Sequence, residues 1–334
     1  MFCYGLALTK LLDCKIMATP HMNSPATLII GAGISGLSCA QTLQNAGHDC
    51  LILDKARGPG GRISSKRTEQ GAVDLGAQYF TARDAGFRAQ VEQWITDQAV
   101  ATWHPKIAVV DASGWVPSPD EQARYVGTPK MGSLAHHLAK SLRIQPQSQV
   151  TAVMENHVIL SDGRMLDFER LVIACPADQA QQLLPDLAVP IQAPCWALWV
   201  DIEGEQPFDA AFVKDSSIGW VAKDSSKPGR NTQNRWVVHP TPEFSQEHLE
   251  EDPAQVSAQL LMELQQILPN DFQINQNGIH RWRYARPWPK DESNRVSFLQ
   301  PSTHIWVCGD YCLGGRVEGA WLSGQQAAQS ILAG

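Results

Sequence analysis

The chain has 334 residues, of which 43% are hydrophobic and 18% are charged, and its formal net charge at pH 7 is -7. This composition is that of a globular protein with one large or two smaller domains, and no apolar run reaches the roughly 18 residues of a membrane-spanning helix. The negative charge offers no basic footprint for nucleic acid. We expect a soluble protein that has neither nucleic acid nor a membrane as its partner, and the sequence leaves its oligomeric state open.

The cysteines and histidines indicate neither disulfides nor a metal site. The eight cysteines are scattered and mostly lie inside apolar runs, as buried thiols do in a reducing compartment, so we predict a cytoplasmic location. Cys308 and Cys312 have a C-x3-C spacing, which differs from the C-x-x-C of dithiol redox proteins. The ten histidines form no ligand cluster with cysteine, so no metal is predicted. Residues 1–24 are predicted to form a loose N-terminal extension.

The first regular elements form a strand-helix-strand unit. Residues 26–30 are a short apolar, β-branched run that is typical of a buried parallel strand, and they lead directly into a glycine-rich turn. Apolar residues at helical spacing begin at Ile34, and Gly47 provides a helix stop before a second apolar strand at 50–53. Further pieces of the same layer are predicted as a helix at 134–142 and strands at 150–154 and 171–174, and the domain recurs near the end as a strand at 304–310 and a helix at 317–332.

Alternating apolar patterns between these pieces indicate a second domain that is built on antiparallel strands. The predicted fold class is therefore α/β, with a Rossmann-like nucleotide-binding domain and an inserted α+β substrate domain. Most of the tryptophans fall in the insertions, where they can line a pocket or fill a core. We assign residues 25–80, 126–187 and 297–334 to the nucleotide domain, and residues 81–125 and 188–296 to the substrate domain.

A G-x-G-x-x-G motif lies between the first predicted strand and helix, at Gly31, Gly33 and Gly36. In this context Gly31 permits the tight turn, Gly33 lets the backbone approach a pyrophosphate, and Gly36 allows the helix to pack closely on the strand. Ile34 and Ser35 supply the first N–H groups of the helix, whose N-terminus is the positive end of its dipole. The motif therefore predicts a dinucleotide site.

The second strand ends at Asp54, where a carboxylate can accept hydrogen bonds from both ribose hydroxyls of an adenosine and would repel a 2′-phosphate. This disfavours NADP but leaves NAD and FAD open. Residues 55–62 contain a second glycine turn with flanking cations, which suits a second phosphate and which a plain NAD site would not need. They favour FAD, bound non-covalently. The predicted ligands in this segment are Lys55, Arg57, Gly61 and Arg62.

The start of the last predicted helix suits a flavin ring. Gly319 and Ala320 are small enough for a planar ring to lie over the N-terminal N–H groups of the helix. Reduced flavin carries negative charge near N1 and C2=O, so this helix end would stabilise the reduced ring. The insertions contain no second strand-GxGxxG-helix unit that could hold NAD(P)H. We therefore expect the reduced flavin to pass its electrons to dioxygen.

Three stretches resemble the flavin-containing amine oxidase superfamily, and within it the renalase-like branch. They are GAGISGL with LDKARGPGGR, VDLGAQYF at 73–80, and CGDYCLGGRVEGAWLSGQQAA at 308–328. The resemblance implies that Asp74 and the turn after it pass beside the flavin ring, that Asp310 bonds the ribityl chain, and that the backbone of Val150 meets the adenine. The predicted cofactor residues in these regions are Gly76, Ala77, Gln78, Val150, Gly309, Asp310, Glu318, Gly319 and Ala320.

The resemblance also implies a substrate. Renalase-like proteins of bacteria are similar in activity to enzymes that oxidise the 2- or 6-dihydro isomers of NAD(P) and make hydrogen peroxide. We accordingly expect hydride transfer from the dihydropyridine carbon to flavin N5, with little acid–base help. Arg283 or Arg286 would meet phosphate or carboxylate groups of the substrate. No residue is assigned as catalytic, and the predicted pocket walls are Trp220, Trp236, His239, Trp282 and Tyr284.

Two alternatives stay open at this point. A flavin-dependent amine or polyamine oxidase would use an aromatic cage around a neutral amine, and tryptophan and tyrosine are available for one. A protein of another class would bind FAD as a stabiliser and act as a non-enzymatic partner-binding module.

Overall fold

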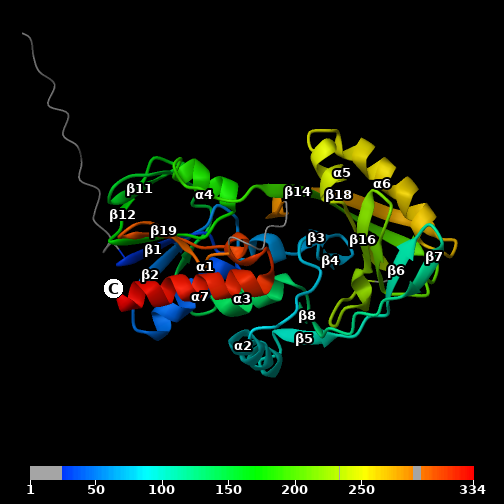
Figure 1. The fold of residues 1–334 in the computed structure, drawn as a ribbon, viewed down its shortest axis with the longest axis horizontal. Coiled ribbons are helices and arrows are strands. Elements are labelled where there is room, and N and C mark those ends of the chain that lie inside the picture. Colours follow the sequence, from blue (N-terminus) through cyan, green and yellow to red (C-terminus); the bar gives the residue numbers. More distant parts are fainter. Residues whose placement is uncertain (1–24, 233, 289–294) are drawn as a thin grey trace, which may run out of the picture.

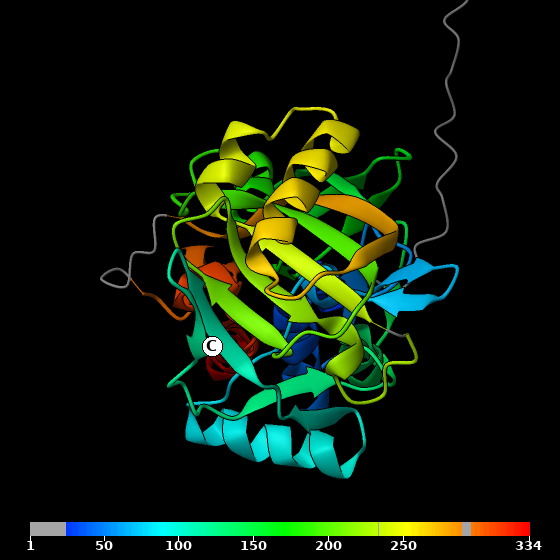
Figure 2. The same ribbon diagram turned by 90° about the vertical axis from the view of Figure 1, so that its right-hand side faces the viewer.

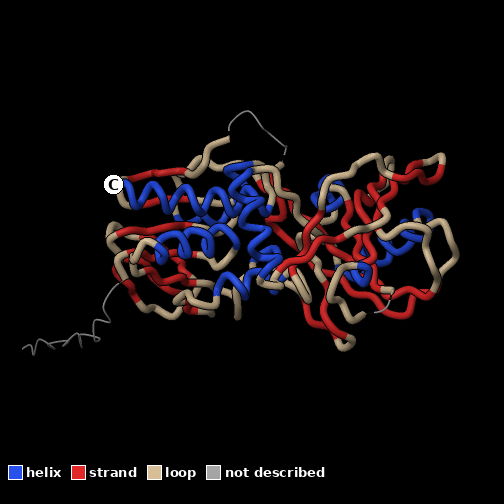
Figure 3. The backbone as a smooth tube through the Cα atoms, turned by 90° about the horizontal axis from the view of Figure 1, so that it is seen from below, coloured by secondary structure: helices blue, strands red, loops and turns tan. Residues whose placement is uncertain are grey.

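The computed structural model describes residues 25–232, 234–288 and 295–334. The predicted extension at 1–24 lies outside this part of the chain. Two lobes lie side by side, one with helices around a mostly parallel sheet and the other with a broad, mostly antiparallel sheet (Figures 1 and 3). The predicted fold class is therefore confirmed. Within the described residues, no helix has the length and apolar character needed to cross a bilayer.

The sheet of the first lobe has the strand order β19-β20-β13-β1-β2-β9, and all its pairs are parallel except β19 with β20. β1 lies at its centre, so that Thr27 pairs with Cys50 on one side and with Arg170 on the other. The predicted apolar runs become buried inner strands because helices or other strands cover both faces. The strands are β1 (Thr27–Ile30), β2 (Cys50–Leu53), β9 (Ile144–Gln145), β13 (Arg170–Ile173), β19 (Leu299–Ser302) and β20 (Ile305–Val307).

One face of this sheet is covered by helices from both ends of the chain. The first and last helices, α1 and α7, pack along each other (Figure 1), and a Cβ on Gly324 of α7 would lie 2.0 Å from the carbonyl oxygen of Ser35 of α1. The hydroxyl of Ser38 also donates to the carbonyl of Trp321 over 2.8 Å. Close crossing of the two helices therefore fixes α7 beside the glycine turn. The helices of this lobe are α1 (Ile34–Asn45), α2 (Ala85–Thr96), α3 (Gly132–Ala139), α4 (Ala177–Leu183) and α7 (Val317–Ala333).

The opposite face carries α4 and a separate three-stranded antiparallel sheet of β10 (Val150–Val153), β11 (His157–Leu160) and β12 (Met165–Asp167). The prediction that the strand at 150–154 belongs to the same layer as β1 and β2 is wrong. Its residues pair only with β11, because a short connection folds the chain straight back into a meander.

The sheet of the second lobe has the order β18-β14-β17-β16-β15-β6-β7, and its pairs are antiparallel except β15 with β6. Helices α5 (Pro242–Glu247) and α6 (Pro253–Ile267) cover one of its faces (Figure 2). The other face is turned toward the first lobe. The strands are β6 (Ile107–Asp111), β7 (Gly114–Pro117), β14 (Gln192–Glu203), β15 (Ala210–Val213), β16 (Ile218–Lys223), β17 (Arg235–Pro240) and β18 (Gln273–Pro287).

Short elements join the lobes. Helix α2, which the sequence analysis assigned to the substrate domain, packs on α7, and the rings of Phe87 and Trp321 lie 5.4 Å apart. The exact domain bounds stay a prediction. The remaining elements are β3 (Lys66–Thr68), β4 (Gly71–Val73), β5 (Val100–Trp103), β8 (Arg124–Gly127) and the 3-10 helices η1 (Gly61–Ile63), η2 (Asp224–Ser226) and η3 (Asp310–Leu313).

Candidate functional site

A cavity of about 1390 Å³ lies between the two lobes. On the first lobe it meets the carboxyl ends of the central strands, through Ile30, Leu53 and Ala174. The strand order places β1 between β2 and β13, which is the switch point where doubly wound sheets bind their ligands. The cavity is also larger than the roughly 300–1,000 Å³ of a pocket for one small ligand. It has room for a dinucleotide and a second molecule.

The three motif glycines fit the roles predicted for them. Gly31 has φ +107°, and a Cβ there would lie 2.7 Å from the carbonyl oxygen of Ala174. A Cβ on Gly36 would lie 2.0 Å from the carbonyl oxygen of Gly31, so this glycine lets α1 pack on the turn. A Cβ on Gly33 would have no atom within 4 Å, because Gly33 faces the cavity. Of the three positions, Gly33 is therefore the one where a Cβ would project into open space.

The N-terminus of α1 at this turn has the properties of an anion site. Gly33 is the N-cap residue, no side chain caps the helix, and its first turn contains no acidic residue. Ile34 and Ser35 also line the cavity. The free N–H groups and the positive dipole end therefore suit a pyrophosphate.

Asp54 lies at the end of β2 in a fixed orientation. Its Oδ2 accepts a hydrogen bond from the N–H of Ala32 (2.6 Å) and its Oδ1 accepts one from the N–H of Ala56 (2.7 Å). A carboxylate has about four acceptor positions, so two remain for ribose hydroxyls. Lys55 lines the cavity beside it.

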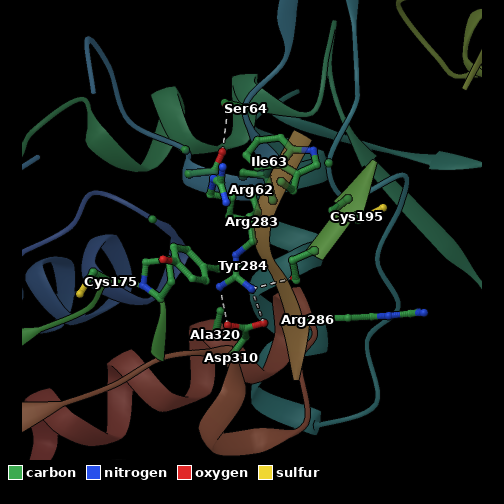
Figure 4. Close-up of a pocket in the computed structure, with 18 of the residues that line it drawn as sticks. Arg62, Ile63, Ser64, Cys175, Cys195, Arg283, Tyr284, Arg286, Asp310 and Ala320 are labelled. Atoms are coloured by element: carbon green, nitrogen blue, oxygen red, sulfur yellow. Dashed lines mark hydrogen bonds and ion pairs between the residues drawn. The ribbon is translucent and has the colours of Figure 1, made fainter. Parts of the chain in front are cut away.

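The second glycine turn packs against the first. The N–H of Gly60 donates to the carbonyl of Ala32 over 2.9 Å, and Gly61 has φ +52°. Arg62 reaches across the cavity floor, where its guanidinium pairs with Asp310 (2.5 and 3.0 Å) and donates to the carbonyl of Ala285 in β18 (3.0 Å), as Figure 4 shows.

Arg57 is a correction to the predicted site. It does not line the large cavity but a separate hollow of about 300 Å³, together with His136 and Lys140 of the α3 region. Its neighbours Ala56 and Gly58 do line the large cavity, so the loop stays beside that cavity while Arg57 lines the separate hollow.

The turn at 76–78 is clamped from both lobes, and we call it the cavity turn. The N–H of Ala77 donates to the carbonyl of Arg62 (3.0 Å), and a Cβ on Gly76 would lie 1.8 Å from the same oxygen. Just before the turn, the carbonyl of Leu75 accepts hydrogen bonds from Trp282 Nε1 (3.0 Å) and His239 Nε2 (2.9 Å) of the second sheet. The two lobes are therefore fixed to each other at the cavity.

Asp74 lies beneath this turn and does not line the cavity. Its carboxylate accepts hydrogen bonds from Ser65 Oγ (2.6 Å), from the N–H of Met131 (3.1 Å) and from the Arg230 guanidinium. Burial alone would raise the pKa of Asp74, but the charges of Lys227 and Arg230 outweigh it and lower that pKa. Asp74 is therefore an ionised anchor of the turn.

The terminal segment supplies the remaining predicted cofactor residues. Gly309, Asp310 and Ala320 line the cavity, as does Val150 from the meander. Gly319 packs on η3, where its Cβ would lie 3.1 Å from the carbonyl of Leu313. Glu318 is buried and accepts hydrogen bonds from the N–H groups of Arg83 (2.6 Å) and Asp84 (2.7 Å), so its contacts are structural. The cavity-lining members of the predicted set are Gly31, Gly33, Ile34, Ser35, Asp54, Lys55, Gly61, Arg62, Gly76, Ala77, Gln78, Val150, Gly309, Asp310 and Ala320.

Four of the five predicted pocket walls line the cavity: Trp220, His239, Trp282 and Tyr284. Trp236 does not, and its assignment is corrected. It lies three positions before His239 on β17, and side chains alternate between the faces of a strand, so the two residues face opposite sides of the sheet. Trp236 packs beneath α6, in the core of the second lobe. Trp220 pairs across the sheet with His239, on the cavity face.

His239 is a neutral imidazole with a defined tautomer. Because a carbonyl oxygen can only accept, the contact with Leu75 places the proton on Nε2 and leaves Nδ1 as an acceptor. Burial, together with the charges of Lys227 and Arg286, lowers the pKa of His239 to about 4 against the opposing effect of the hydrogen bond to Leu75. It therefore contributes hydrogen bonding and shape at neutral pH and no charge.

Charge is unevenly distributed over the cavity lining. Its carboxylates are Asp54 and Asp310, both on the first lobe, whereas the described wall residues on β16, β17 and β18 include no carboxylate. Sequence analysis did not single out Lys66, Arg281 or Arg316, which also line the cavity. Arg281 lies on the same strand as Trp282 and Tyr284, although alternation directs its side chain to the other face.

The arginines of β18 differ in their partners. Arg283 is bound by Glu250 (2.5 and 3.0 Å) and Arg281 contacts the same carboxylate (3.1 Å). Arg286 has no carboxylate partner among the residues the structure describes; its guanidinium lies 5.8 Å from the Trp288 ring and extends away from the Arg62–Asp310 pair (Figure 4). Of the two arginines predicted to meet an anion, Arg286 is the one available to do so.

The described thiols are poorly suited to redox or covalent chemistry. Burial raises the pKa of Cys308 and of Cys312 to about 12, and has the same effect on Cys175 and Cys195 at the cavity wall. All four are therefore protonated at neutral pH. No group of three potential metal ligands occurs in the described part of the chain.

Comparison with known proteins finds two family models that match separate parts of the chain. Residues 29–92 match the family model for an NAD(P)-binding Rossmann-like domain, and residues 220–332 match the one for flavin containing amine oxidoreductase. The chain is thus similar to flavin-containing amine oxidoreductases in a region that includes the second-lobe wall of the cavity and the terminal helix. A flavin-containing family implies FAD as the cofactor, and the glycine turns, Asp54 and the cavity fit that molecule.

Individual relatives match over short regions. Hydroxyneurosporene desaturase of Rubrivivax gelatinosus is 34% identical over 85 residues, which are 25% of this chain and 14% of the relative. L-amino-acid oxidase of Siganus canaliculatus is 38% identical over 72 residues, or 21% and 14% of the two chains. The aligned part is thus about a seventh of each relative's length.

A crystal structure shares the whole fold. A protein of Exiguobacterium sp. 255-15 that is assigned as a protoporphyrinogen oxidase superposes with a TM-score of 0.74 at 14% identity, over 93% of this chain and 99% of that chain. The architecture of both lobes is therefore common to the two proteins.

The glycine turn gives a paired prediction. Gly36→Ala places a methyl group against the Gly31 carbonyl, so it should destabilise the fold by about 1–3 kcal/mol or more and release FAD. Gly33→Ala, whose Cβ projects into the cavity, should leave the Tm unchanged but weaken FAD retention about tenfold, or about 1.4 kcal/mol. Thermal unfolding and flavin content after dialysis measure the two effects. Equal losses of Tm in both variants would contradict the distinction.

His239 gives a prediction of pH dependence. Its folded pKa of about 4 lies below the ordinary value of 6.5, so the unfolded chain binds more protons between these pH values and this contribution to stability is lost as the pH falls from 6.5 toward 4. Between pH 7 and pH 5 the wild type should lose about 2 kcal/mol more than His239→Gln, which keeps an N–H donor but does not titrate. Urea unfolding at the two pH values measures the difference, and identical losses would refute it.

Proposed function

We propose that the protein is an FAD-dependent oxidase that accepts a hydride from a small reduced anionic substrate, most specifically the 2- or 6-dihydro isomers of NAD(P). Held non-covalently in the cavity, FAD would supply a two-electron acceptor for the hydride, and dioxygen would take up the two electrons as hydrogen peroxide. The observation that carries the proposal is a second-lobe wall with cations and aromatic rings and no described carboxylate. A dinucleotide carries phosphates that this wall can attract.

The chain's own residues would bind, orient and exclude water. The N-terminus of α1 and Gly33 would meet the pyrophosphate, and the N-terminus of α7 beside Ala320 would stabilise negative charge on the reduced ring. Trp220, Trp282 and Tyr284 offer flat apolar surface for a nicotinamide, and catalysis then consists mainly of positioning the donor carbon about 3–3.5 Å from the acceptor. No general base is required.

The amine or polyamine oxidase alternative is less well supported by the charge distribution. A polyamine is a polycation at neutral pH, and Arg286 on the wall would repel it, whereas the charges of Arg281 and Arg283 are partly balanced by Glu250. A neutral amine could still use the aromatic surface. The non-enzymatic alternative predicts that bound flavin has no access to a reductant.

Substrates of different charge separate these proposals. Borohydride-reduced NAD⁺ contains the 2-, 4- and 6-dihydro isomers, and mixing it anaerobically with the yellow protein should bleach the flavin, with hydrogen peroxide formed when air is admitted. Benzylamine and spermidine should not bleach it. Bleaching by an amine and by no dihydro isomer would establish the amine oxidase instead, and bleaching by dithionite alone would favour the binding protein.

Arg286 provides a matched pair of variants for the substrate charge. Arg286→Gln removes a cation that has no carboxylate partner within the described part of the chain, and it should raise KM for the dihydro isomers about tenfold, or about 1.4 kcal/mol, with little change in kcat. Arg283→Gln, whose guanidinium is already bound by Glu250, should change KM by less than about twofold. Steady-state peroxide formation at low and high salt measures both. The same KM change in the two variants would argue against an anion site at Arg286.

A further inference from the structure

A cluster of buried charges lies directly behind the cavity turn. It contains Lys227, Asp224, Asp74 and Arg230, which we call the buried charge cluster, and none of its members lines the cavity. The Lys227 side chain is 0% exposed; its Nζ lies 2.6 Å from Asp224 Oδ1, 3.8 Å from Asp74 Oδ2 and 5.8 Å from the centre of the Trp103 ring. The cluster joins η2 of the second lobe to the loop that carries the cavity turn.

The cluster is hard to explain by stability alone. Removing two charges from water costs several kcal/mol per ion, and replacing a buried ion pair by apolar residues is often neutral or stabilising. The cost is visible at Asp224, where burial raises the pKa despite the adjacent ammonium group, and its Oδ2 is buried without a hydrogen-bond partner in the described structure.

Besides the two carboxylates, the side chain of Lys227 has a third polar partner, Gln78, which is the last residue of the cavity turn. Nζ donates to Gln78 Oε1 over 3.1 Å. An ammonium group can only donate, so this contact fixes which end of the amide is oxygen. The Nε2 of Gln78 then donates to the carbonyls of Asp74 and of Gly76 (3.2 Å), which closes the turn on itself. Without Lys227, the buried amide oxygen has no donor among the described residues, and the amide keeps only the two bonds that its Nε2 donates to the turn.

We infer that Lys227 is a positioning residue for FAD, which sets the cavity turn against the flavin by orienting the amide of Gln78. This inference rests on the proposed FAD site but not on the identity of the substrate. Lys227 does not reach the cavity itself, because Gln78 lies between them. Lys227 would thus act on the cofactor although it takes no part in the hydride transfer itself.

The test compares two buried cations of the second lobe. Lys227→Met removes the donor to Gln78, whereas Arg235→Met breaks the pair with Asp201 (2.6 Å), in which the arginine side chain is as buried as that of Lys227 and which does not touch the cavity turn. Both variants should lower Tm. Only Lys227→Met should also change the visible spectrum of bound FAD, shift its midpoint potential in a dithionite titration, and lower kcat about tenfold while KM stays within twofold. For the midpoint potential, a tenfold change in the ratio of oxidised to reduced flavin corresponds to about 30 mV for two electrons.

A second comparison separates positioning from charge. The double variant Lys227→Met with Asp224→Asn restores the charge balance of the cluster but not the donor to Gln78, so the flavin changes should persist in it. Gln78→Met reaches the same contact from the cavity side and should reproduce the spectrum of Lys227→Met, and combining the two should add little further change.

The outcomes decide the inference independently of the substrate, because the spectrum and the potential require bound FAD only. If both ion-pair variants lose Tm and leave the flavin spectrum and potential unchanged, Lys227 is merely structural and the inference is overturned. Recovery of a wild-type potential in the double variant would overturn it as well, since charge alone would then account for the effect. A protein that shows these flavin shifts but oxidises no dihydro isomer would contradict the proposed substrate and leave the inference standing.

Discussion

The backbone carbonyl of Leu75 is a central hydrogen-bond acceptor between the two lobes of this molecule. The oxygen of Leu75 belongs to the loop that follows the β3–β4 hairpin, and both of its hydrogen-bond donors, His239 and Trp282, come from the second sheet. The adjacent turn in turn packs on the carbonyl of Arg62. The cofactor loops and the substrate wall are therefore placed relative to each other by a few short polar contacts, and the volume between them depends on those contacts.

The two sides of the cavity differ in their charged groups. On the nucleotide side, the carboxylates of Asp54 and Asp310 are already engaged, one by backbone N–H groups and the other by Arg62. On the opposite wall the charge is cationic, and His239 stays neutral because burial disfavours its charged form. A negatively charged ligand would therefore meet attraction at the wall and little repulsion from the cofactor side.

The strands and helices of the nucleotide lobe could be predicted from the sequence because each depends on residues close together in the chain. The apolar runs, the helix stop at Gly47 and the spacing of the three glycines each depend on a few neighbouring residues. Trp236 was misplaced although strand alternation alone separates it from His239. Lys227 could not be found from sequence, because a lysine in a Ser-, Pro- and Gly-containing loop is ordinarily exposed, and its burial arises only where η2, Gln78 and Trp103 meet.

The pairing of distant segments in both sheets has a consequence for how the protein is made. The nucleotide sheet is completed only when Ile305–Val307 docks beside β13, and α1, which also packs on α3, lacks the helix on its other side until α7 exists. The second sheet likewise joins β6 to β15, about a hundred residues later in the chain. Part of the apolar surface of α1 therefore stays exposed until the last part of the chain has been synthesised. We expect the growing chain to depend on chaperones until then, and FAD to enter after translation.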